Sequence, residues 1–306
     1  MSQQLVAPRA SDPPGAVGYP LVLTGPDQSP AKHLTGVMVT VLAFVILVPL
    51  TSQLILRITW LARGRPPFDD YSSEAMAYVL PEGLAASHLG LAMLIPISLL
   101  AVRYLHGRSP GWLVSVQPGF RWRYLAATLL VALVVLNGVL WLSFLAIELP
   151  VFQAPQPQWA VFLGIILITS PLQALAEEFF FRGYVLQALG SAFNQAWVGI
   201  IGSTLLFALF HGVQNPALFV DRLAFGVLVG WLVLRTGGLE AAIGAHVVNN
   251  VFAFGYGIFT GGVAATKAIS VIGWDKAFFD VLGFGLFAVA AWWVGRRMNV
   301  ATVTPD

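Results

Sequence analysis

The sequence predicts an all-α protein, a polytopic integral membrane protein with about eight transmembrane helices. Three observations support this class. The chain of 306 residues is 58% hydrophobic and only 10% charged, whereas about 25% of the residues in a soluble globular domain are charged. Its mean hydropathy is +0.79. Apolar runs of the roughly 20 residues that cross a bilayer recur along the chain.

Each expected helix is one such apolar run. In chain order they cover residues 35–61, 86–105, 124–147, 158–188, 196–212, 218–235, 240–259 and 278–295. The fourth run is long and carries Pro171, which predicts a kinked or tilted helix. The fifth and sixth runs are short and contain glycine, which is typical of tightly packed interior helices.

The segments between the runs divide the chain into four parts. Residues 1–33 are rich in Pro, Ser, Gln and Gly, which predicts a disordered N-terminal tail. Residues 34–150 hold the first three helices. Residues 151–262 hold the next four helices and nearly all the polar residues found inside spans. Residues 263–306 supply the last helix and a C-terminal tail.

The distribution of Lys and Arg predicts that both chain ends are cytoplasmic. Eight spans place the two ends on one side of the membrane, and cytoplasmic loops are enriched in Lys and Arg. Excluding the intramembrane Arg182, the side of the chain ends carries nine basic residues and the other side six. The nine are Arg9, Lys32, Arg103, Arg108, Arg121, Arg123, Arg235, Arg296 and Arg297, and the six are Arg57, Arg63, Arg65, Arg222, Lys267 and Lys276.

The composition also excludes several kinds of site and partner. The chain has no cysteine, so it forms neither disulfides nor thiolate metal sites and has no thiol nucleophile. The net charge of +2 is too small to indicate a nucleic-acid partner. The oligomeric state leaves no signature in the sequence.

The fourth span carries three ionisable residues in its middle, Glu177, Glu178 and Arg182. Each charged group near the bilayer centre costs roughly 2.5–3.5 kcal/mol, so such a group is a functional-site candidate by default. Glu178 and Arg182 are four apart and can pair on one helix face. Glu177 is rotated about 100° from Glu178, so we expect one carboxylate to pair and the other to face a cavity.

Two other spans carry polar residues at helical spacing. Phe207 and His211 lie in the fifth span, and His246 and Asn250 lie in the seventh, where residues four apart can pair. A carboxylate such as Glu177 is a suitable general base, and a nearby histidine can orient the same water. A second histidine and an amide offer donors for a developing oxyanion. These parts suit amide hydrolysis by an activated water.

Taken together and in order, these residues resemble the motifs of a known family. Residues 177–182 read EEFFFR and match EExxxR, residues 207–211 match FxxxH, and residues 246–250 match HxxxN. The chain resembles the CaaX protease and bacteriocin-processing family, also called the CPBP or ABI family, which includes the Ras-converting CaaX endopeptidases. The resemblance covers about residues 155–260.

The resemblance implies an eight-helix intramembrane protease whose cavity opens to the membrane and the cytosol, with its catalytic core within residues 151–262. It implies that Glu177 and His211 activate the water and that His246 and Asn250 form the oxyanion hole. The supporting residues it implies are Glu178, Arg182 and Phe207. Its substrate would be a membrane-associated peptide or a lipidated protein, including prenylated CaaX tails, and it would need no cofactor.

Three alternatives stay open. In a zinc-dependent version of the same protease the ligands would be Glu177, His211 and His246, although the HExxH pattern is absent. The protein could instead be a non-catalytic bacteriocin-immunity or peptide-binding membrane protein. It could also be a proton-coupled transporter, because carboxylates and histidines within spans build proton relays. The same residues could also have purely structural roles. Glu178 and Arg182 could be a structural ion pair, and His246 and Asn250 could be an interhelical hydrogen-bond pair.

Overall fold

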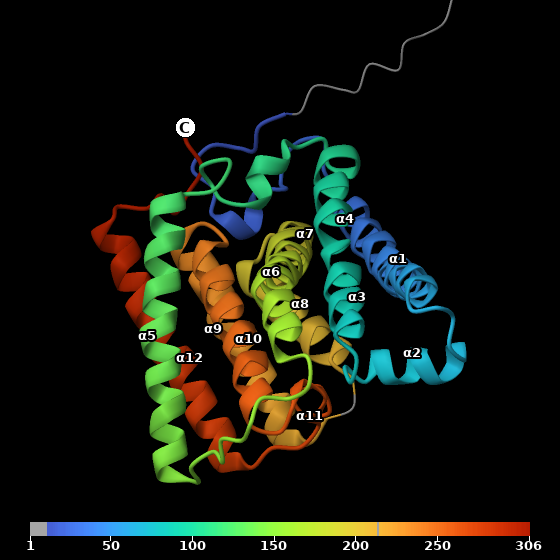
Figure 1. The fold of residues 1–306 in the computed structure, drawn as a ribbon. Coiled ribbons are helices and arrows are strands. Elements are labelled where there is room, and N and C mark those ends of the chain that lie inside the picture. Colours follow the sequence, from blue (N-terminus) through green and yellow to red (C-terminus); the bar gives the residue numbers. More distant parts are fainter. Residues whose placement is uncertain (1–10, 213) are drawn as a thin grey trace, which may run out of the picture.

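The protein is a bundle of helices, and the computed structural model describes residues 11–212 and 214–306 of it (Figure 1). With η for a 3-10 or π-helical turn, the described elements are η1 (Tyr19–Leu21), α1 (Pro30–Ala62), α2 (Phe68–Met76), α3 (Pro81–Ala92), α4 (Leu94–Leu100), η2 (Ala101–Leu105), η3 (Pro110–Leu113), α5 (Trp122–Ala146), α6 (Trp159–Glu177), η4 (Glu178–Val185), α7 (Leu186–Phe193), α8 (Ala196–Phe210), α9 (Pro216–Thr236), α10 (Glu240–Phe259), α11 (Val263–Lys267) and α12 (Trp274–Arg297). Within those ranges the extended structure is limited to isolated bridges.

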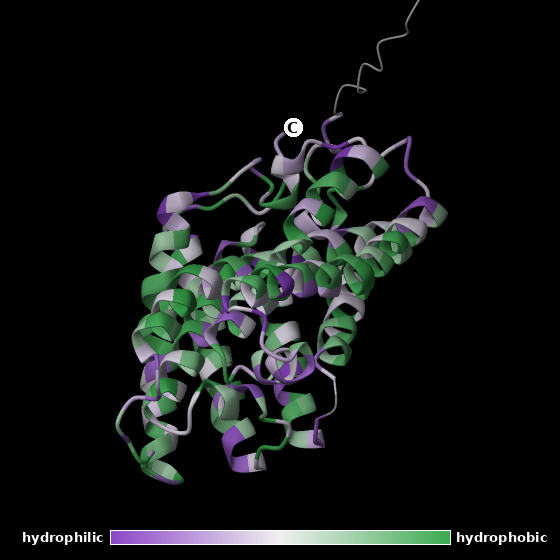
Figure 2. Ribbon diagram, turned by 45° about the vertical axis from the view of Figure 1, so that its right-hand side comes forward, coloured by the Kyte–Doolittle hydropathy of each residue, from purple (hydrophilic) through white to green (hydrophobic). Residues whose placement is uncertain are grey.

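Seven helices in the described part of the chain are long and apolar enough to cross a membrane. Four of them are α1, α5, α9 and α12, and the others are α10, the continuous run α3–α4–η2 and the continuous run α6–η4–α7. Apolar side chains cover the outer faces of these helices, and Met38 and Leu50 of α1 are 71% and 60% exposed. Figure 2 shows hydrophobic residues along the helices and hydrophilic residues at both ends and in the interior. The predicted class, an all-helical polytopic membrane protein, is confirmed.

Helix α8 differs from the eight full-length spans that the sequence predicts. It has 15 residues and extends about 22 Å at 1.5 Å per residue, short of the roughly 30 Å hydrocarbon core. It ends at Phe210 because the backbone of Gly212 turns to a φ of 77°. Asn215 then caps the N-terminus of α9 through Leu218 N at 3.1 Å. Non-helical backbone at membrane depth is tolerated where it is buried in protein or lines a water-filled cavity.

The two ends of the described chain lie on the same side of the bundle. Gly18 and Val303 form an antiparallel bridge, and Thr304 N donates to Val17 O at 2.9 Å. These segments are at the top of Figure 1, whereas α2 and α11 lie at the opposite end. The chain ends lie on one side because the seven long helices together with the short α8 make an even number of passes through the bundle.

The prediction that residues 1–33 form a disordered tail is wrong for the part that the structure describes, which is packed against the helices. Tyr19, Val22 and Leu23 are fully buried, and the Tyr19 hydroxyl donates to Leu113 O. The Arg108 guanidinium binds the same segment through the carbonyls of Asp12 and Thr24. The composition hid a short apolar run at residues 19–23, whose burial against the helix ends orders the segment. Residues 1–10 lie outside the described residues.

Candidate active site

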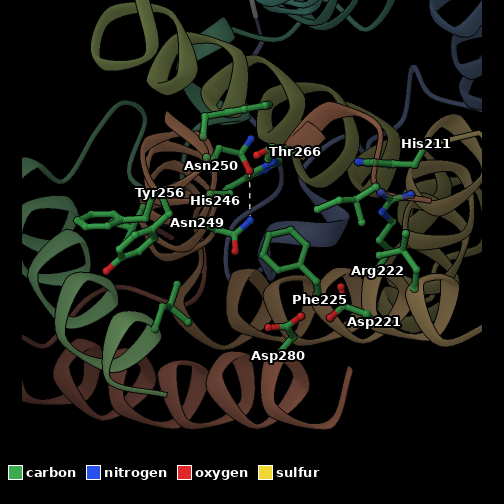
Figure 3. Close-up of a pocket in the computed structure, with 18 of the residues that line it drawn as sticks. His211, Asp221, Arg222, Phe225, His246, Asn249, Asn250, Tyr256, Thr266 and Asp280 are labelled. Carbon is green, nitrogen blue, oxygen red and sulfur yellow. Dashed lines mark hydrogen bonds between the residues drawn. The ribbon is translucent and has the colours of Figure 1, made fainter. Parts of the chain in front are cut away.

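A cavity of about 750 Å³ lies between α5, α6, α8, α9, α10 and α12. It is lined by all four predicted catalytic residues, which come from three of the predicted spans: Glu177, His211, His246 and Asn250. Figure 3 shows His211 and Arg222 close together at one side and Asn249 hydrogen-bonded to Asn250 at another. The structure therefore brings the four predicted catalytic residues to one cavity.

The two adjacent glutamates face different surroundings, as the sequence predicts. Glu177 ends α6 and Glu178 begins the π-helical segment η4, a kind of turn that often occurs at functional sites. Glu177 lines the cavity and is 7% exposed, whereas Glu178 is fully buried. One carboxylate is thus available to a ligand and the other is committed to the protein.

Glu178 is the centre of a buried charge network. Its Oε1 accepts from Arg182 Nη1 at 3.1 Å and lies 2.7 Å from His246 Nδ1. The fully buried Arg182 guanidinium also stands 4.0 Å from the centroid of the Phe207 ring and 5.2 Å from that of Phe225. The aromatic faces partly replace water as partners for the cation. The network fixes Arg182 and the Nδ1 side of His246.

Within the described chain, the Oε2 atom of Glu177 is buried without a hydrogen bond. Its Oε2 is buried, lies 3.4 Å from His246 Nε2, and has no hydrogen-bond partner among the described residues. A buried carboxylate oxygen without a partner is costly, and here it sits at a cavity. Glu177 also lines the cavity, so its carboxylate is the one of the two that can contact a ligand there.

His211 is oriented by the residue four before it. Its Nδ1 lies 2.7 Å from the carbonyl of Phe207, and its ring packs edge-on at 4.4 Å from the Phe207 ring. A carbonyl only accepts, so Nδ1 carries the proton and the lone pair of Nε2 is free for another partner. This contact explains the FxxxH spacing, because Phe207 both supports Arg182 and fixes the tautomer of His211.

Asn250 does not pair with His246, although their spacing permits it. Its Nδ2 donates to Gln173 Oε1 at 2.8 Å, and its Oδ1 accepts from Asn249 at 3.2 Å. Gln173 was missed by sequence reasoning. The available signal was its position four residues before Glu177, on the same face of the helix.

Five further charged residues line the cavity beyond the predicted set. They are Asp221, Arg222, Lys267, Lys276 and Asp280. Asp221 and Arg222 lie inside the sixth predicted span, where charges are expensive, so the sequence did carry a signal for them. The other three belong to the connection from α10 to α12 and the start of α12, where charges are common and indicate little.

The site residues do not fit a three-ligand zinc centre. In the described ranges no group of three or more His, Asp or Glu side chains is placed to hold a metal ion. Both ring nitrogens of His246 already face carboxylates, Nδ1 at 2.7 Å from Glu178 and Nε2 at 3.4 Å from Glu177. Glu178 is not a candidate ligand, so Nδ1 is committed to the protein, whereas Nε2 faces Glu177 within the site.

The polar end of the cavity lies away from the chain ends. Lys267, Ile269 and Ser270 line it and belong to the α10–α12 connection. Two predictions from the sequence therefore conflict. The resemblance implies that the cavity opens to the cytosol, whereas the Lys and Arg distribution places the chain ends, at the opposite side of the bundle, in the cytosol.

The natural absence of cysteine gives a direct test of orientation. The Lys and Arg count places the chain ends inside the cell. We therefore expect Ser270→Cys, at the polar end of the cavity, to react with a membrane-impermeant maleimide on intact cells. Thr302→Cys, near the C-terminus, should be protected. Permeabilised cells serve as the labelling control. The reverse pattern would place the cavity in the cytosol and contradict the charge-based prediction.

Comparison with known proteins identifies a family for part of the chain. Residues 158–252 match the model of the Rce1-like family, described as type II CAAX prenyl endopeptidase Rce1-like. The matched segment contains every predicted site residue, and it confirms the resemblance inferred from the three motifs. Over 180 residues the chain is 28% identical to the uncharacterized protein YyaK of Bacillus subtilis (strain 168).

The extent of these matches is limited. The alignment with YyaK covers 55% of this chain and 59% of that protein. The chain therefore spans less than two thirds of the length of this curated relative. No solved structure matches the chain.

Proposed function

Because residues 158–252 match the Rce1-like family, we propose that this membrane protein is an intramembrane endopeptidase that hydrolyses a peptide bond of a membrane-associated peptide or lipidated protein. The observation that carries the proposal is the cavity-facing Glu177, whose Oε2 is buried without a hydrogen bond. A carboxylate held in this way beside a histidine is suited to activating water. Prenylated CaaX tails are the substrate class that the family suggests.

Water activation is the first step of the proposed mechanism. A water at the cavity side of Glu177 gives a proton to that carboxylate, and its oxygen attacks the scissile carbonyl carbon. His211 orients the same water, because its Nε2 has a free lone pair while Nδ1 is held by Phe207 O at 2.7 Å. The proton on Glu177 then passes to the leaving amine as the C–N bond breaks. Hydrogen-bonded general bases of this kind contribute typically 10²–10⁴-fold to a rate.

The oxyanion is the second feature of the mechanism. Asn250 uses one Nδ2 hydrogen on Gln173 at 2.8 Å, which leaves the other for the developing negative charge. The Nδ1 of His246 faces Glu178 at 2.7 Å, and its Nε2, 3.4 Å from Glu177 Oε2, is the nitrogen that would donate to the oxyanion. Fixed donors aimed at the oxyanion are each worth roughly 10²–10³ in rate. Glu178 and Arg182 position these donors.

We expect cleavage to be insensitive to chelators, because in the described ranges no three His, Asp or Glu side chains are placed to hold a metal ion. The measurement is the initial cleavage rate before and after dialysis against EDTA or 1,10-phenanthroline. Added zinc should not raise the rate of the dialysed protein. A rate that is lost on dialysis and restored by zinc would replace this mechanism by a metal-dependent one.

The proposed function is tested with purified protein in nanodiscs and a farnesylated CaaX peptide. The expected result is release of a C-terminal fragment, identified by mass spectrometry, beside a matched unprenylated peptide and a transmembrane peptide that report which substrate features are needed. A folded protein that binds these peptides and releases no fragment would favour the peptide-binding or immunity alternative over hydrolysis.

A further inference from the structure

Two cations line the cavity without a carboxylate partner. Arg222 and Lys267 both line it, and within the described ranges neither forms an ion pair at 4.0 Å or less. The third cavity cation, Lys276, is paired with Asp280 at 3.2 Å. Among these three cavity cations, Lys276 is held in an ion pair, and Arg222 and Lys267 are not.

The contacts of the two cations leave donors free. Arg222 Nη1 donates to Gln214 Oε1 at 2.5 Å, which anchors one arm of the guanidinium in the α8–α9 connection. The Lys267 ammonium lies 5.2 Å from the centroid of the Tyr78 ring. An arginine fork and an ammonium that converge in one cavity offer the donors that a carboxylate or phosphate requires.

The charges of Glu177 and Arg222, which line the same cavity, both act on Lys267. Burial lowers the pKa of the Lys267 ammonium, the charge of Glu177 raises it, and the charge of Arg222 lowers it further. Like charges that share a cavity repel one another, and a bound anion between them would relieve that repulsion. Figure 3 shows Arg222 beside His211, so such an anion would bind close to the proposed catalytic water.

We propose that Arg222 and Lys267 bind the free C-terminal carboxylate of the peptide substrate. This inference rests on the proposed function and adds to it a reason for cutting near the end of the chain. A carboxylate anchored beside His211 places the last peptide bonds of the substrate at Glu177, whereas an internal segment of a transmembrane helix offers no such charge. The protein is then selective for a carboxyl-terminal tail.

The test compares a farnesylated CaaX peptide with its C-terminal amide, which removes the negative charge and changes little else. Binding is measured by fluorescence anisotropy with the Glu177→Gln variant in phosphatidylcholine nanodiscs, so that cleavage does not interfere. We expect the amide to bind roughly tenfold or more weakly, since hydrogen bonds to charged groups are worth that much. In the Glu177→Gln background, Arg222→Gln or Lys267→Met should abolish the difference between the two peptides.

Lys276→Met is the matched control, because this lysine lines the same cavity but already has a carboxylate partner. It should keep the full difference between acid and amide. Lys267 ends the short helix α11, outside the seven long apolar helices, so Lys267→Met gives a result even where Arg222→Gln fails to fold.

Five results would overturn the anchor. Equal binding of acid and amide would do so, and so would a difference that survives Lys267→Met. Binding that responds to phosphatidylglycerol in the nanodisc and not to the end of the peptide would assign the two cations to a lipid phosphate. If the wild-type protein cleaved acid and amide at equal rates, the anchor would be rejected and the proposed hydrolysis kept. If the acid bound more tightly than the amide but neither was cleaved, the anchor would be kept and the hydrolysis rejected. No binding of either peptide by folded protein would reject both.

Discussion

Glu177→Gln is expected to lower the cleavage rate by about 10²–10⁴-fold, the usual contribution of a general base, without unfolding the protein. Glutamine keeps the size of the side chain and cannot take the proton of the attacking water. Because Glu177 Oε2 has no hydrogen-bond partner in the described chain, replacing it breaks no hydrogen bond at that atom. The measurement is the initial rate of peptide cleavage together with the thermal unfolding temperature of each variant.

Asp280→Asn is the matched control for Glu177→Gln. Asp280 is another carboxylate that lines the same cavity, and it is paired with Lys276. It has no part in the proposed chemistry, so its replacement should leave the rate near that of the wild type. Full activity in Glu177→Gln would show that another group activates the water.

Arg182→Met is expected to cause the largest loss of stability in the protein. It leaves the fully buried Glu178 carboxylate without its guanidinium, and breaking one side of a buried ion pair typically costs about 3–5 kcal/mol. His246, which shares Glu178 Oε1, loses its fixed orientation as well, so activity should fall with stability. Chemical unfolding in detergent micelles measures the first effect and peptide cleavage the second.

Two further variants separate charge from packing in this experiment. The double variant Glu178→Gln with Arg182→Met removes both charges and should recover part of the lost stability, because it leaves no buried charge without its partner. Arg63→Met breaks the half-exposed pair with Glu82 and should cost at most about 1 kcal/mol. Equal losses for Arg182→Met and Arg63→Met would contradict the central role given to the buried network.

Helical spacing allowed much of the site to be predicted from the sequence. The spacing of Glu178 and Arg182 predicts their pair, and the 100° rotation between adjacent helix positions predicts that Glu177 faces elsewhere. Both features are present. The three motifs placed four candidate catalytic residues, and all four line one cavity. The catalytic roles themselves stay predictions until the variants are measured.

Other features depend on contacts that a local pattern does not contain. Asn250 bonds to Gln173, 77 positions away in the chain, because α10 packs against α6. The early end of α8 depends on the turn at Gly212, whereas hydropathy alone continues the apolar run. The order of residues 11–29 depends on partners such as Leu113 and Arg108, which composition does not reveal.

The packed N-terminal segment has a consequence for the ion gradients of the cell. A wet cavity that reaches the middle of the bilayer halves the thickness of the barrier to protons and small ions. The remaining half must be dry, and Tyr19, Val22 and Leu23 fill the bundle on the side of the chain ends with fully buried apolar groups. Tyr19 is tied to Leu113 by its hydroxyl. We therefore expect the segment to act as a seal, so that water could enter the cavity from one side without dissipating the membrane potential.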